Sequence, residues 1–176
     1  MDLIITTERL ILRQLLSSDA EAMFEMDHNP EVHKYLWNKP TETIEETKEI
    51  IEYVRKQYLD NGIGRFAVVL KDTNEFIGWA GIKFITEPEN GQVNFYDFGY
   101  RLNEKFWGKG YATEASYAWL DYGYNQMNIK IMNAYAQSAN GASNHILQKI
   151  GMTLKEQYLS DGVQWNWYEM HAPSSK

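Results

Sequence analysis

The residues best suited to chemistry surround two glycines that stand just ahead of a helical run. Glycine is among the poorest helix formers, so Gly108 and Gly110 weaken the first turn of the helix expected from Tyr111 onward. Without a Cβ, such a turn can bring the backbone N–H groups of a helix N-terminus close to an anion such as a phosphate or pyrophosphate. Two lysines would add positive charge there, Lys105 and Lys109. A tight turn without any ligand is the alternative, and the spacing alone does not separate the two.

Other known site patterns are incomplete in this chain. Position 113 is threonine, so the dinucleotide fingerprint G-x-G-x-x-G fails, and no Gly-Lys-Ser/Thr follows at the spacing of a P-loop. The four histidines at positions 28, 33, 145 and 171 have no metal-ligand spacing, and there are no cysteines. No G-x-S-x-G marks a hydrolase nucleophile. We therefore expect no metal and neither a cysteine nor a hydrolase-type serine nucleophile.

The composition is that of a globular protein, with 44% hydrophobic and 14% aromatic residues among 176. We expect one domain over residues 1–172 and a loose tail over 173–176. The formal charge of −7 argues against nucleic acid and favours cationic partners such as amines. No apolar run approaches the ~20 residues of a membrane span, and no secretory signal is visible, so the expected location is the cytoplasm.

The first part of the chain predicts one strand and then helices. Residues 8–15 are compatible with a strand, and Ser17 or Ser18 would cap the helix that follows. Pro30 would end or redirect that helix. A long amphipathic helix begins after Thr43, which forms a capping box with Glu46.

The rest of the chain predicts a sheet crossed by two helices. Three strands over 65–70, 76–85 and 92–102 form an antiparallel meander, and the glycine turn and its helix lead to a strand over 130–137. A short helix ending at Gly151 and a hairpin over 153–159 and 164–172 complete the order. The predicted class is α/β (α+β), a mixed, mostly antiparallel central sheet with helices on both faces. The strands on either side of the glycine-turn helix should be parallel, because a helical crossover joins them.

Two segments resemble a known family. "YRLNEKFWGKGYATEA" and "NGASNHILQKIGM" resemble motifs A and B of the GNAT acyl-CoA N-acetyltransferase superfamily. The opening "TERLILRQL" and the wording "WGKGYATEA" resemble its RimJ/RimL-type branch, which acetylates the N-termini of ribosomal proteins. The resemblance implies the GNAT fold and direct transfer of an acetyl group from acetyl-CoA to a primary amine, without a covalent enzyme intermediate.

The resemblance also implies which residues bind coenzyme A. The backbone of the turn would hold the pyrophosphate, over Lys105, Phe106, Trp107, Gly108, Lys109, Gly110, Tyr111 and Ala112. Lys105 departs from the Gln or Arg of the family at the first position. The preceding strand would carry a bulge at Gly99, and its backbone would pair with the pantetheine arm and polarise the thioester carbonyl, over Gly99, Tyr100, Arg101 and Leu102.

Motif B implies two further contacts to the cofactor. Asn140 would hydrogen-bond the pantetheine, and Ser143 would lie near the thioester sulfur. Many members carry a tyrosine one turn later that protonates the departing thiolate, but this chain has Leu147 there. Ser143, directly or through water, then becomes the candidate acid. A simple helix N-cap is the alternative for Asn140 and Ser143.

The attacking amine must first lose a proton, for which Asp97 is the preferred base and Glu114 a poorer one. Period-two alternation sets Asp97 on the face opposite Tyr96 and Phe98. A solvated carboxylate without catalytic function is the alternative for Asp97.

The acceptor site is expected to involve aromatic residues, Tyr35, Trp37 and Trp79, although such residues are more often core. A protein N-terminal amine is the preferred acceptor, and a polyamine or other small amine is the alternative. A non-catalytic acyl-CoA sensor and a generic nucleotide-phosphate binder are the alternatives from other classes. The sequence leaves open whether the chain is a monomer or a homodimer.

Overall fold

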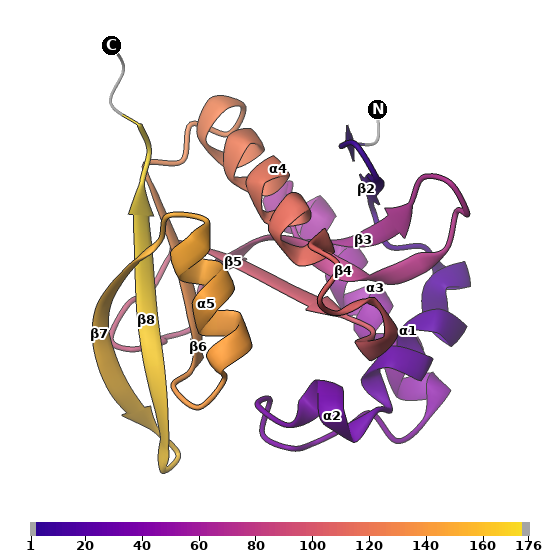
Figure 1. Ribbon diagram of the computed structural model, residues 1–176, viewed down its shortest axis with the longest axis horizontal. Coiled ribbons are helices and arrows are strands. Elements are labelled where there is room, and N and C mark those ends of the chain that lie inside the picture. Colours follow the sequence, from indigo (N-terminus) through magenta and orange to yellow (C-terminus); the bar gives the residue numbers. More distant parts are fainter. Residues whose placement is uncertain (1–2, 174–176) are drawn as a thin grey trace.

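A twisted sheet of eight strands organises the molecule, which we describe from a computed structural model covering residues 3–173 (Figure 1). The strand order is β1-β2-β3-β4-β5-β6-β8-β7, and all neighbours are antiparallel except β5 and β6. The predicted mixed, mostly antiparallel sheet and its one parallel pair are confirmed. The strands are β1 (Ile4–Thr6), β2 (Leu10–Arg13), β3 (Arg65–Leu70), β4 (Phe76–Ile85), β5 (Phe95–Leu102), β6 (Ile131–Gln137), β7 (Thr153–Ser160) and β8 (Val163–His171).

Helices cover both faces of this sheet. Figure 1 shows α4 crossing the central strands on one side, with α3 on the other, and α5 lying against β6 and β7. Both α1 and α4 contact β4, from opposite sides. The helices are α1 (Ala20–Asp27), α2 (Pro30–His33), α3 (Ile44–Asn61), α4 (Tyr111–Asn125) and α5 (Gly141–Lys149), with short 3₁₀ turns at η1 (Ser17–Asp19) and η2 (Glu104–Phe106).

The sheet opens between its two parallel strands. β5 pairs with β4 along its whole length without a register shift, but it pairs with β6 only at Tyr96 and Asp97. In Figure 1, β6, β8 and β7 stand upright at the left while β3–β5 run across to the right. From Phe98 onward, the β6-facing edge of β5 therefore has no strand partner among the described residues.

The bulge expected at Gly99 is absent from the ladder with β4, where Gly99 lies opposite Gly81. A Cβ at Gly99 would lie 2.8 Å from Nη2 of Arg65. The glycine is therefore needed because the Arg65 guanidinium occupies the space above the strand, which requires no irregularity in the backbone.

Local predictions at the N-terminal end need correction. The sequence predicted a first strand over 8–15, whereas the sheet has a separate β1 paired with a shorter β2. Neither Ser17 nor Ser18 caps α1: both lie in η1, and the N-cap residue is Asp19, whose carboxylate binds Arg13 instead.

The capping box of α3 is half formed. Thr43 Oγ1 accepts a hydrogen bond from the Glu46 backbone N–H at 3.3 Å. The Glu46 carboxylate accepts from the backbone of Glu42 at 3.0 Å.

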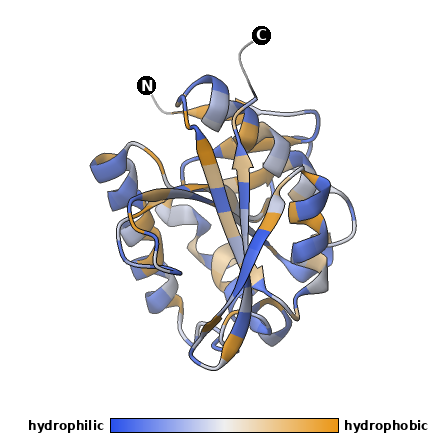
Figure 2. Ribbon diagram, turned by 90° about the vertical axis from the view of Figure 1, so that its left-hand side faces the viewer, coloured by the Kyte–Doolittle hydropathy of each residue, from blue (hydrophilic) through white to orange (hydrophobic). Residues whose placement is uncertain are grey.

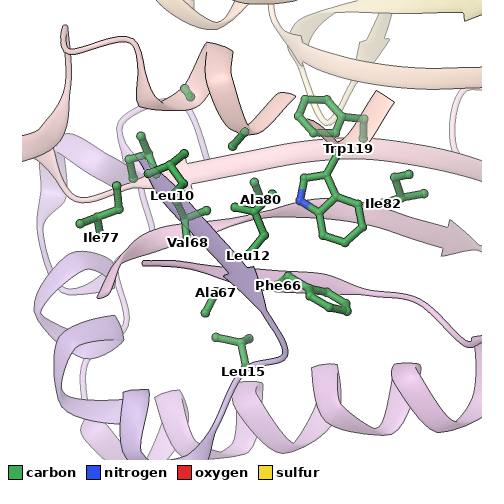
Figure 3. Packing of buried hydrophobic residues seen from close by; sticks show 14 of the residues in the cluster. Leu10, Leu12, Leu15, Phe66, Ala67, Val68, Ile77, Ala80, Ile82 and Trp119 are labelled. Atoms are coloured by element: carbon green, nitrogen blue, oxygen red, sulfur yellow. The ribbon is translucent and has the colours of Figure 1, made fainter. Parts of the chain in front are cut away.

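The core lies between the sheet and its helices. Trp119 of α4 is fully buried and packs edge-on against Phe66 of β3, with ring centroids 4.9 Å apart. Figure 3 shows this indole above Phe66, with Ala80 and Ile82 of β4 beside it. Burial of these apolar surfaces supplies the main stabilisation of the fold.

The outer edge of the sheet is β7, which is exposed along most of its length. Figure 2 faces this edge and shows long hydrophilic stretches on the strands nearest the viewer. Among residues 3–173, none of the helices is both long and apolar enough to cross a membrane.

Candidate active site

The glycine turn has left-handed backbone at both glycines. Gly108 has a φ of 71° and Gly110 a φ of 83°, so the turn requires glycine on conformational grounds alone. Gly110 is also the N-cap of the fifteen-residue helix α4, and no side chain caps the first turn. A Cβ at Gly108 would meet no atom within 4 Å. The turn therefore combines a tight bend with an open helix N-terminus, which is the kind of site that binds anions.

Glu114 fastens this turn to the N-terminal strands. Its carboxylate accepts from Thr7 Oγ1 at 2.6 Å, from the Arg9 backbone N–H at 2.8 Å and from Arg9 Nε at 2.7 Å. Arg9 Nη1 also donates to the Lys109 carbonyl at 2.9 Å. Burial raises the pKa of Glu114, but the hydrogen bonds from Thr7 and Arg9 outweigh it, and the net pKa is lowered. Glu114, the second candidate base, is thus engaged in holding the turn.

The two lysines of the turn have different surroundings. Lys105 Nζ lies 3.4 Å from Glu25 and 3.3 Å from Glu75, so its charge is shared between two carboxylates. Lys109 Nζ lies 5.4 Å from the ring centroid of Phe106, and it makes no ion pair among the described residues. Lys109 is the lysine whose charge is left for an anion at the turn.

On β5, alternate residues face different helices. Tyr100 is largely buried near Ser143 of α5. Burial raises the pKa of Tyr100, and Ser143 partly opposes this rise. Leu147 is buried in the core at 3% exposure. The structure therefore brings together two residues predicted to contact the cofactor, Tyr100 and Ser143, across the opening between β5 and α5.

The first turn of α5 is held by side-chain amides. Asn140 Oδ1 accepts from the Ser143 backbone N–H at 3.1 Å, so Asn140 is the N-cap of α5, and its contact to pantetheine stays a prediction. Asn144 is buried and makes all four of its hydrogen bonds, at 2.7–2.9 Å. Its partners are the carbonyls of Gln137 and Asn140, the Asn166 amide and the Tyr168 hydroxyl. Sequence reasoning missed Asn144, which fixes the turn carrying Ser143 to β6 and β8.

Asp97 lies on the opposite face of β5, as the alternation predicted. Its side chain is buried rather than solvated, and its carboxylate forms an ion pair with Arg65. Arg65 Nη1 also donates to the carbonyls of Gly81 at 2.5 Å and Asp97 at 2.8 Å. Burial raises the pKa of Asp97 above its ordinary value, although Arg65 opposes the rise.

A cavity of about 420 Å³ lies on this same face, between the sheet and α1–α3. Of the three aromatic residues expected at an acceptor site, Trp79 lines it, whereas Tyr35 and Trp37 are not among its lining residues. Trp37 instead packs against Trp165 of β8, with centroids 5.5 Å apart. The cavity is lined by Leu15, Met23, His33, Lys39, Pro40, Thr41, Glu46, Ile50, Val54, Arg65, Trp79 and Arg101.

Comparison with known proteins decides the family. The model of the acetyltransferase (GNAT) domain matches residues 9–153. The chain belongs to the GNAT acetyltransferase family. It is 32% identical over 155 residues to an uncharacterized N-acetyltransferase p20 of Bacillus licheniformis, covering 88% of this chain and 84% of the relative.

Two further likenesses involve proteins with named acceptors. The spermidine N(1)-acetyltransferase of Escherichia coli K12 is 24% identical over 150 residues, covering 85% of this chain and 76% of that protein. A RimL ribosomal L7/L12 alpha-N-protein acetyltransferase, solved in complex with coenzyme A, superposes with a TM-score of 0.81 at 21% identity, covering 96% and 98% of the two chains. The chain is an acetyl-CoA-dependent N-acetyltransferase, and its likeness to RimL is a likeness of fold.

In this acetyltransferase, sequence reasoning missed a buried polar group beside the cavity. Asp27 of α1 is fully buried and accepts from Arg101 Nη1 at 2.7 Å, and Nε2 of His33 lies 3.5 Å away. Burial raises the pKa of Asp27, but His33 and Arg101 outweigh it and hold the pKa below its usual value. No recognised spacing connects these three residues, because α1, α2 and β5 meet only in the folded chain. Within residues 3–173, no three His, Cys, Asp or Glu side chains are grouped to hold a metal ion.

Proposed function

We propose that this acetyltransferase modifies the amino-terminal amine of a protein, and that acetyl-CoA and acceptor reach the reaction centre from opposite faces of β5. The observation that carries the proposal is the cavity beside Trp79 and Arg101, because β5 separates it from the face that carries Tyr100 and Ser143. The charge balance of the cavity then favours a protein terminus over a polyamine.

On the face of β5 that carries Tyr100, the residues present fit coenzyme A. The open N-terminus of α4 and Lys109 would bind the pyrophosphate. The β6-facing edge of β5 after Asp97 offers backbone groups to the pantetheine arm and an N–H to the thioester oxygen. Ser143 lies in the first turn of α5, beside the opening between β5 and β6, and Asn140 caps that turn.

The reaction then requires an uncharged amine and a leaving thiol. The acceptor ammonium loses a proton, for which Asp97 is the proposed base, and the neutral nitrogen attacks the thioester carbonyl carbon. The C–N bond forms and the C–S bond breaks, and the thiolate takes up the second proton lost by the acceptor nitrogen, directly or relayed through Ser143. The products are the N-acetyl amine, free coenzyme A and one proton released to solvent.

The charges around the cavity disfavour a polyamine as acceptor. A polycation is best held by several free carboxylates. Glu46 is the one carboxylate residue lining the cavity, whereas three cationic residues line it, Lys39, Arg65 and Arg101. The nearby acids Asp27 and Asp97 are already paired with guanidiniums. The volume suits a small group, so a protein acceptor would insert only its terminus.

Thiol release from acetyl-CoA against a panel of amines tests this proposal. The panel holds N-terminal peptides of ribosomal proteins, spermidine, free amino acids and aminoglycosides. We expect release with peptides, with mass spectrometry locating the acetyl group on the α-amine rather than on lysine. Faster release with spermidine than with every peptide would overturn the proposed acceptor and leave the transferase activity standing.

A further inference from the structure

Buried polar atoms without partners gather at one end of the cavity. In the part of the chain that the structure describes, eight buried side-chain nitrogen or oxygen atoms have no hydrogen-bond partner. Four of them belong to one group of three residues: Oδ2 of Asp27, both ring nitrogens of His33 and Nε of Arg101. Buried polar groups in folded proteins are normally satisfied, so such a cluster marks a polar end of the cavity whose hydrogen bonds the fold alone does not complete.

Asp27 holds the other two residues in the cavity wall. It lies behind them, fully buried, with Arg101 Nη1 at 2.7 Å and His33 Nε2 at 3.5 Å. His33 and Arg101 both line the cavity, while Asp27 does not. The Arg101 guanidinium lies 5.0 Å from the ring centroid of Trp79, and its side chain is 21% exposed. The partly exposed Arg101 guanidinium is therefore the donor that this wall presents to the cavity, and the Asp27 carboxylate behind it balances its charge. The His33 ring nitrogens are buried.

The other charged groups around the cavity do not form ion pairs with Arg101 or His33. Arg65 is committed to Asp97, and Glu46 accepts from the backbone of Glu42. Lys39 lines the cavity from the α2–α3 connection and adds one positive charge. A group entering here meets hydrogen-bond donors and a mildly positive wall, and a second ammonium would find no free carboxylate at His33 and Arg101.

We propose that Arg101 determines acceptor specificity by donating to a carbonyl oxygen attached to the carbon that bears the reacting amine, and that His33 is a positioning residue beside it. This inference rests on the proposed function and makes the acceptor an α-aminoacyl group. A carbonyl oxygen accepts from a guanidinium N–H, whereas a polyamine carries no acceptor at this position. A peptide, an amino-acid amide and a free amino acid share this chemistry, so the experiment separates these sources.

The test compares two acceptors that differ at this group alone. L-Alaninamide and isopropylamine share the amine-bearing carbon and one methyl group, but a second methyl replaces the carboxamide in isopropylamine. The wild type should have a higher kcat/KM for alaninamide. Arg101→Lys and His33→Asn should each reduce the alaninamide-to-isopropylamine ratio roughly 10- to 100-fold, as expected for a lost hydrogen bond involving a charged or buried group. The loss should fall more heavily on alaninamide than on isopropylamine, because only alaninamide carries the carbonyl oxygen.

His28→Asn is the matched control. His28, the C-cap residue of α1, is exposed and does not line the cavity, and its Nδ1 donates to the Thr41 carbonyl at 2.9 Å. Its variant should keep the wild-type ratio. Equal loss with both acceptors in Arg101→Lys and His33→Asn, or an unchanged ratio, would overturn the specificity role.

Three further acceptors identify the source of the carbonyl and separate the two proposals. If an N-terminal peptide is acetylated faster than alanine, the bound group is a peptide carbonyl. If alanine is acetylated faster, the bound group is a free carboxylate. Efficient acetylation of spermidine with no preference for alaninamide overturns this inference and leaves acetyl transfer intact. Silence with every amine, while coenzyme A still binds, would mean that the proposed function has failed and that this inference falls with it.

Discussion

At the scale of single residues, the position of Asp97 is compatible with two roles, that of the catalytic base and that of the ion-pair partner of Arg65. It lies on the face of β5 toward the cavity, but Arg65 and the protein interior surround its carboxylate. A base must reach the proton that it removes, and a buried ion pair must also be maintained for the fold. Because the pKa of Asp97 is raised, the pH dependence of the rate separates the two roles.

Asp97→Asn should lower kcat at neutral pH by roughly 10²-fold or more if Asp97 is the base, with little change in the Kd for coenzyme A. The base must be ionised, so the rate falls as pH drops through its pKa. Because burial raises the pKa of Asp97, this acidic limb should lie above about pH 4, and it should vanish in the variant. The pH dependence of kcat/KM is the measurement.

Asp19→Asn is the control, because Asp19 is also buried and ion-paired, with Arg13, and lies outside the cavity lining. It should lower stability without altering the pH profile. An acidic limb retained in Asp97→Asn would remove Asp97 as the base and leave it as the partner that holds Arg65.

At the scale of elements, the turn from β5 into α4 carries the proposed cofactor site. Its glycines have left-handed backbone, its helix has no capping side chain, and Lys109 stands beside it without an ion-pair partner among the described residues. The anion site would therefore be a property of the whole turn, with backbone N–H groups as the donors.

Gly110→Trp should weaken coenzyme A binding at least about tenfold, because the side chain would occupy the turn and even a Cβ lies 3.3 Å from Arg9 Nη2. Titration calorimetry gives the Kd. Gly62→Trp is the matched control: Gly62 has a φ of 72° at the C-terminus of α3 and no atom within 4 Å of its Cβ. Similar melting temperatures but unchanged cofactor affinity in Gly110→Trp would contradict the motif A site.

At the scale of the whole molecule, a few contacts join segments that are far apart in sequence. Glu114 of α4 binds Thr7 and Arg9 across more than a hundred residues. Because these bonds favour the ionised carboxylate, its folded pKa lies below its unfolded value. The stabilisation is therefore present above the unfolded pKa of about 4.3 and lost as pH falls through the folded pKa.

Glu114→Gln should lower the free energy of unfolding at pH 7 by about 1–2 kcal/mol, or the Tm by roughly 2–8 °C. The difference from the wild type should narrow as the pH falls below about 4. Thermal unfolding across this pH range is the measurement. Glu45→Gln, which removes an exposed pair with Lys48, should change little at any pH. A pH-independent difference for Glu114→Gln would contradict an electrostatic origin.

Much of this protein followed from its sequence by itself. The meander, the helical crossover and the closing hairpin follow from residue periodicity and turn chemistry, which act over a few neighbours. The alternation of β5 set Asp97 opposite Phe98 for the same reason, and Gly108 and Gly110 marked their turn because its backbone angles are a local property.

Only the tertiary structure decided how these parts meet. It placed β8 between β6 and β7, separated β5 from β6 after Asp97, and left Gly99 as space for Arg65 rather than as a bulge. It also brought Asp27, His33 and Arg101 to one cavity wall from two helices and a strand. Such arrangements depend on packing and ion pairs between residues distant in the chain, for which no periodicity or short motif exists.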